Sequence, residues 1–173
     1  MAAEHSSTLE DALRGDEDAL EAVLDGVVVP LFDLAFHLAR SAVGGGELVI
    51  LGLRGLKQQI ETGALAHPDP LLVAARSVLD QAPPIPASEH PLHMRLDRIP
   101  LPERRAALAS AALEVDGAEL GYVLGVAAKA ADETASRGRS ALRLTPEALR
   151  DALDEEAAKV TLPRGLVDRA LAS

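Results

Sequence analysis

The spacing of apolar residues predicts helices in the N-terminal part of the chain. In residues 9–24 the apolar side chains recur three or four positions apart, which is the spacing of one helical face, but Gly15 interrupts them. Gly15 is therefore expected to end one short helix and Asp16 to cap the next. The apolar run at 27–38 is helical in the same way, with Pro30 either in a first turn or at a kink.

Two more helices are expected before a proline-rich segment. Residues 47–60 and 70–80 have the composition of apolar helices, and the glycine-rich stretch 41–46 is expected to be a loop. Residues 81–100 contain five prolines, which resist helix and strand. We therefore predict a stiff linker there and place a domain boundary on it.

A helix-turn-helix is expected within residues 101–143. Pro102 suits the first turn of a helix, because its missing N–H would have no partner there. A short helix at 118–124 and a longer one at 128–142 are separated by Gly125, which can adopt the left-handed conformation that the turn needs. The residues expected to pack inward from the longer helix are Ala131, Ala135 and Leu142.

Residues 144–173 are expected to form a helical tail. Thr145 can cap a helix, Pro146 suits its first turn, and Glu147 complements its dipole. Pro163 is expected to end this helix before a second short apolar segment. Such a tail can either dock on the rest of the chain or present a helix to a partner.

Three groups of residues in the segment 101–143 follow one family pattern. They are Leu101, Pro102, Glu103, Arg104 and Arg105; Glu119, Leu120, Val123, Leu124, Gly125 and Val126; and Arg137, Arg139, Ala141, Leu142 and Arg143. The segment resembles region four, the promoter-reading C-terminal domain, of sigma factors of the extracytoplasmic-function type. The resemblance implies an all-α protein with a region-two-like domain at 1–80, a linker at 81–100, a helix-turn-helix domain at 101–143 and an extension at 144–173.

The first 80 residues resemble region two of the same sigma factors. Residues 13–21 (LRGDEDALE) and 30–35 (PLFDLA) follow the family's opening helices. The family's polymerase-gripping helix aligns with residues 47–60, which implies contact with RNA polymerase or another partner there. The partner-binding residues implied are Glu47, Leu48, Val49, Ile50, Leu51, Arg54 and Lys57, although Ile50 and Leu51 replace polar residues of the family and are expected to belong to the core.

The departures from the family pattern fall on positions that meet DNA. The recognition helix begins with the altered residues Ala130, Ala131, Asp132, Glu133 and Thr134, where the family has lysine and arginine neighbours. Acidic side chains are repelled by phosphates and release no counterions. We therefore expect DNA binding to be weak or absent; any that is retained would use Lys129, Arg137, Arg139 and Arg143. Pro70 also replaces the tryptophan of the promoter-melting helix.

Composition supports packed helices and limits the chemistry. Of the 173 residues, 48% are hydrophobic but only 2% aromatic, so the core must be built from Ala, Leu and Val, which favours helices over a sheet. The absence of cysteine excludes disulfides and Cys-ligated metals and agrees with a cytoplasmic protein. The N-terminus lacks the pattern of a signal peptide, and we expect no membrane association. The net charge is −10, and no segment of the chain has the basic stripe that usually binds nucleic acid.

No catalytic or cofactor site is expected. The three glycines at 44–46 are not followed by the Gly-Lys-Ser/Thr of a phosphate loop. His90 and His93 could form a metal pair, but without further ligands they are expected to be exposed, and His37 is assigned no role. We therefore predict no cofactor, no metal and no enzymatic activity.

Three functions stay open. The first is a sigma-factor-like transcription regulator with a degenerate DNA surface, which acts through contacts with RNA polymerase core or an anti-sigma factor. The second is a working sigma factor, in which Arg54, Lys57 and Arg76 lie near polymerase or the displaced strand. The third is a structural or assembly protein that uses the scaffold for self-association or another partner.

Overall fold

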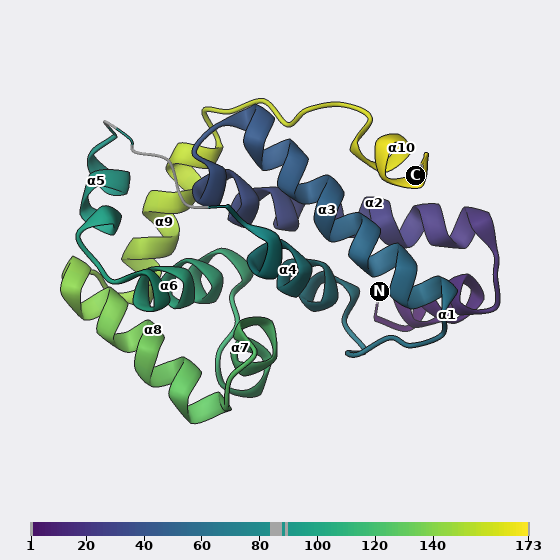
Figure 1. Cartoon of the computed structure of the whole chain (residues 1–173), viewed down its shortest axis with the longest axis horizontal. Helices are drawn as coiled ribbons and strands as arrows, with labels where there is room; N and C mark the ends of the chain where they lie inside the picture. Colours follow the sequence, from purple (N-terminus) through teal and green to yellow (C-terminus); the bar gives the residue numbers. More distant parts are fainter. Residues whose placement is uncertain (1, 84–87, 89, 173) are drawn as a thin grey trace.

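The computed structural model describes residues 2–83, 88 and 90–172, with the side chains of residues 2–6 left aside. Within these residues the chain is all-helical, as predicted, and no strand is found (Figure 1). The helices are α1 (Ala2–Leu13), α2 (Glu17–Ala39), α3 (Ala42–Glu61), α4 (Pro70–Gln81), α5 (Pro91–Asp97), α6 (Leu101–Leu113), α7 (Gly117–Leu124), α8 (Ala128–Leu142), α9 (Pro146–Ala157) and α10 (Leu166–Leu171).

Local signals position the helix ends that the sequence predicts. Asp16 caps α2 by accepting a hydrogen bond from the Ala19 N–H at 2.9 Å. Thr145 caps α9 in the same way through the Ala148 N–H at 3.1 Å. Gly125 ends α7 in the left-handed region, at φ 69°. Pro30 lies inside α2, which continues past it to Ala39.

The prediction of a loop at residues 41–46 is wrong. Ser41 caps α3, which begins at Ala42 and includes all three glycines. Gly45 and Gly46 are buried where α3 meets other parts of the chain. A Cβ at Gly45 would lie 3.1 Å from Phe36 Cα, so the close approach of α3 to α2 requires a residue without a side chain. Tertiary packing therefore outweighs the low helix propensity of glycine here.

The linker expected at residues 81–100 is helical in part. Residues 84–87 and 89 lie outside the described residues, but Pro91–Asp97 form α5, with Pro91 in its first turn. Leu92, Leu96 and Ile99 are buried. The prolines therefore do not keep this part of the segment extended, because a proline at a helix start costs no hydrogen bond. In the tail, α9 ends at Ala157, before Pro163.

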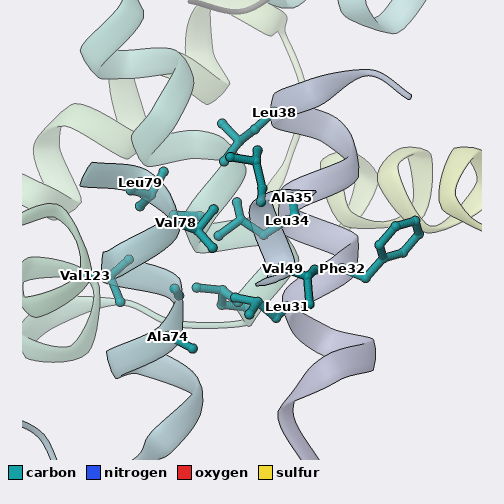
Figure 2. Packing of buried hydrophobic residues seen from close by; sticks show 14 of the residues in the cluster. Leu31, Phe32, Leu34, Ala35, Leu38, Val49, Ala74, Val78, Leu79 and Val123 are labelled. Atoms are coloured by element: carbon teal, nitrogen blue, oxygen red, sulfur yellow. The ribbon is translucent and has the colours of Figure 1, made fainter. Parts of the chain in front are cut away.

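The core is centred on α2. It packs against α1, α3 and α4 and also contacts α6 and α9. Figure 2 shows Val123 of α7 beside Ala74 and Val78 of α4, so the predicted region-two-like and region-four-like segments pack against each other. Arg76 of α4 strengthens this contact by donating to the Tyr122 carbonyl at 3.1 Å. The domain boundaries themselves stay a prediction.

Helix α2 is also long and apolar enough to cross a membrane by composition alone. Its most apolar window has a mean hydropathy of 1.7, and 56% of that window is buried inside the protein. A core helix has the same composition, so this feature is weak evidence for a membrane span.

Candidate functional site

Helices α7 and α8, the pair that the sequence predicts as a helix-turn-helix, pack closely on each other. Leu120 and Val123 of α7 and Ala131 and Ala135 of α8 are buried. Gly121 lies against the turn, where a Cβ would come within 2.8 Å of the Val126 carbonyl oxygen. The turn therefore presents α8 as a rigid helix with one face to solvent.

The cations on the solvent face of α8 are paired with acids. Lys129, whose side chain is 90% exposed, lies 3.9 Å from Glu133 one turn later. Arg137 lies 3.4 Å from Glu103 of α6 and also donates to Thr134 Oγ1 at 3.1 Å. These pairs leave little net positive charge on the face that would meet a nucleic acid.

Asp132 has a structural role rather than a place on the solvent face. Its carboxylate accepts a hydrogen bond from the Gly117 N–H at 2.7 Å, at the first residue of α7. Asp116, the cap residue of α7, makes no such bond with its side chain, so Asp132 satisfies the helix start from the neighbouring helix. Of the other altered positions, Ala131 is buried, Ala130 and Glu133 are exposed, and Thr134 Oγ1 donates back to the Ala130 carbonyl at 2.6 Å.

The structure does not bring the four predicted DNA-binding cations onto one face. Arg139 is half-buried and donates to Ser110 Oγ of α6 at 3.4 Å, and it lines a pocket between α6 and the start of α9. Arg143 caps the far end of α8 in the left-handed region, at φ 54°. Only Lys129 and Arg137 remain on the outward face, and both are paired.

The predicted partner-binding helix is α3, and the tail covers part of it. Leu48, Val49 and Ile50 are buried and Leu51 is half-buried, which agrees with the core role expected for the apolar pair. Glu47 and Arg54 are exposed, and Lys57 pairs with Glu61 at 3.1 Å.

Helix α10 lies against α3 and α2 (Figure 1). Arg54 Nη2 donates to the Arg169 carbonyl at 3.2 Å, and a Cβ placed at Gly46 would lie 3.0 Å from Pro163 Cγ and 3.4 Å from Leu166 Cδ2. A shallow pocket of about 450 Å³ at this contact is lined by Glu47, Ile50, Leu51, Arg54, Arg169 and Ala172. The expected partner surface is therefore shared with the protein's own C-terminal helix.

A buried pair of histidines joins three helices that are distant in sequence. His37 of α2 lies with its Nδ1 3.3 Å from His93 Nε2, and its Nε2 lies 3.0 Å from the Leu153 carbonyl of α9. The carbonyl can only accept, so His37 Nε2 carries a proton and Nδ1 accepts from His93 Nε2–H. His93 Nδ1 is then the acceptor for Ser88 Oγ, at 3.3 Å. Both rings are neutral in this arrangement.

Burial lowers the pKa of both histidines. The pKa of His37 falls from 6.5 to about 4, mainly through desolvation and secondly through His93. The pKa of His93 also falls from 6.5 to about 4, through desolvation and then through Arg40. The expectation that His93 is exposed is therefore wrong, and no group of ligands that could hold a metal is found among the described residues. Nothing in the local sequence pairs His37 with His93, since 56 residues separate them.

Comparison of the chain with protein-family models, with curated proteins and with solved structures finds no match.

Proposed function

We propose that this protein is a sigma-factor-like transcription regulator that acts through protein contacts rather than by reading promoters. The ordered resemblance of residues 9–143 to sigma factors motivates the proposal. The observation that carries its second part is the outward face of α8, where Lys129 and Arg137 are both paired with acids. A face without free cations gains little from counterion release on DNA.

The partner surface in this proposal is the exposed edge of α3. Glu47 and Arg54 flank the shallow pocket there, and their opposite charges suit a polar partner surface rather than a nucleic acid. The partner is RNA polymerase core or an anti-sigma factor.

Co-elution with bacterial core RNA polymerase at physiological salt tests the proposal, with an ordinary extracytoplasmic-function sigma factor as the positive control. We expect the protein to co-elute with core polymerase or, failing that, with an anti-sigma factor in the same assay. We also expect no run-off transcript from genomic fragments. A transcript that depends on the protein would favour the working sigma factor instead.

The third function, an assembly protein, gives a different result. It predicts a mass above that of the monomer in light scattering, rising with protein concentration, and no binding to either transcription partner. A monomer that binds neither polymerase nor an anti-sigma factor would contradict both self-association and the proposed function.

Releasing α10 is expected to tighten binding at α3. Leu166 is a buried residue of α10, so Leu166→Asp should detach α10 from α3, while Asp168→Asn on the exposed side of the same helix serves as the matched control. Because a partner would no longer have to displace α10, we expect several-fold tighter binding for Leu166→Asp and wild-type affinity for the control. Hydrogen exchange in residues 166–171 reports the release. Faster exchange without a gain in affinity would show that α10 does not compete for the surface.

A further inference from the structure

Three arginines converge on one pocket between α5 and the C-terminal end of α8. This arginine pocket, of about 220 Å³, is lined by Arg95, Arg98, Ile99, Ala141, Leu142 and Arg143. Figure 1 shows the end of α8 beside the segment that joins α5 to α6. No acidic residue lines the pocket, although the whole chain carries a net charge of −10.

The acidic residue nearest to these arginines in sequence, Asp97, is already paired with other arginines. Asp97 accepts two hydrogen bonds from Arg40, the residue that follows α2, and lies 3.1 Å from Arg104 of α6. In the described part of the chain no ion pair involves Arg95, Arg98 or Arg143. What distinguishes the pocket is that it gathers three such arginines and no acid, since Lys57, Arg76, Lys129 and Arg150 each lie beside a carboxylate of their own helix.

Capping of α8 accounts for only part of this charge. Arg95 Nη2 donates to the Leu142 carbonyl, which is one of the last carbonyls of the helix. The C-terminus of a helix carries the equivalent of about half a negative elementary charge. Three guanidinium groups carry about three positive charges, because arginine stays protonated in proteins. The pocket therefore keeps a net positive charge after the cap is satisfied.

We propose that the arginine pocket binds a phosphate group. Guanidinium groups present paired N–H donors whose spacing matches the oxygens of a phosphate, and such bonds are stronger than those between neutral groups. An anion held there would also relieve the repulsion among the three like charges. Ile99, Ala141 and Leu142 are the apolar residues that line the pocket.

The phosphate has two sources with the same chemistry. It is either a free phosphate or phosphomonoester, or the backbone of a nucleic acid. The site lies at the end of α8 rather than on its outward face, so binding here is independent of any partner on α3.

The test uses the full chain and three probes: inorganic phosphate, pyrophosphate and a 20-base-pair duplex of random sequence. Arginine side-chain NMR signals follow each titration in the wild type and in the double variant Arg98→Gln, Arg143→Gln. Glutamine keeps much of the side-chain length and removes the charge. Arg164→Gln, at an exposed arginine in the segment between α9 and α10, is the matched control. Circular dichroism confirms that each variant is folded.

We expect saturable binding of at least one probe by the wild type and the control, weakened at least tenfold in the double variant. Duplex binding that weakens in the double variant would identify the nucleic-acid backbone as the source. Binding of phosphate or pyrophosphate with no such effect on the duplex would identify a free phosphate. The proposal is overturned if no probe shows saturable binding that depends on Arg98 and Arg143.

Discussion

Gly138→Ala is expected to destabilise the protein by about 2 to 3 kcal/mol, because the new methyl group would meet the backbone of α6. A Cβ at Gly138 would lie 2.5 Å from the Glu103 carbonyl oxygen and 3.0 Å from Ala107 Cβ. The first contact involves main-chain atoms, so it cannot be relieved by a side-chain rotation. Helix α8 would have to move away from α6, and the packing of Ala107, Ala131 and Ala135 would loosen.

Gly26→Ala is the matched control for this substitution. Gly26 is an exposed position within α2, and nothing lies within 4 Å of a Cβ placed there. Since alanine has the higher helix propensity, this variant is expected to be stabilised by about 0.5 to 1 kcal/mol. Urea unfolding followed by circular dichroism gives both free energies. Equal stability of the two variants would contradict the close approach of α8 to α6.

Lowering the pH from 7 to 5 is expected to reduce the free energy of unfolding by about 2 kcal/mol for each histidine of the buried pair. In the folded state the pKa of His37 and of His93 is about 4, against 6.5 ordinarily. As the pH falls below 6.5, the two histidines bind protons in the unfolded chain but stay neutral in the folded chain. Their contribution to the free energy of unfolding is therefore fully present above pH 6.5 and is lost progressively as the pH approaches 4.

The geometry of the pair explains why the folded protein disfavours protonation of these histidines. A proton on His37 Nδ1 would face the N–H of His93 Nε2, 3.3 Å away, and the hydrogen bond between the rings would be lost. The other groups near the pair are His90 before α5, Arg40 after α2, Asp97 of α5, and Asp154 and Glu156 of α9. The acids favour protonation, but desolvation outweighs them.

The pH range separates the histidines from the carboxylates. The hydrogen bond from Arg40 lowers the pKa of Asp97 below 3.8, and that from Lys159 lowers the pKa of Glu156 below 4.5. Protonation of these two carboxylates therefore reduces the free energy of unfolding only at a lower pH than 5. Burial raises the pKa of Asp33, which acts in the opposite direction. Urea unfolding at pH 7 and pH 5 should show a smaller loss for the double variant His37→Leu, His93→Leu than for the wild type. An equal loss in both proteins would exclude the pair as the cause.

The helices themselves could be predicted because their signals lie within a few residues of each other. Asp16 and Thr145 are capping residues that accept from an N–H three positions later. Gly125 is the left-handed residue that ends α7, and the apolar spacing of α8 identifies Ala131 and Ala135 as buried. Each of these features depends on backbone geometry and side-chain periodicity, which a short stretch of sequence contains.

The candidate site was predicted only in part. The acids at the start of α8, where the family resemblance places a recognition helix, are visible in the sequence, but Glu133 is paired within its own helix while Asp132 caps another. The pairing of Arg137 with Glu103 also joins residues 34 positions apart. Such roles depend on how α6, α7 and α8 are placed relative to each other, which no local pattern specifies.

By itself, the sequence determined that the chain is helical, where α2, α7, α8 and α9 begin, and that the core is built from aliphatic side chains. Only the tertiary structure decided that Gly45 and Gly46 lie inside a helix, that His37 meets His93, and that α10 rests on α3. The physical reason is the distance along the sequence over which each interaction acts. Helix caps and periodicity act over a few residues, whereas close approach, burial and the pKa of a buried ring depend on segments that are distant in sequence and meet only in the folded protein.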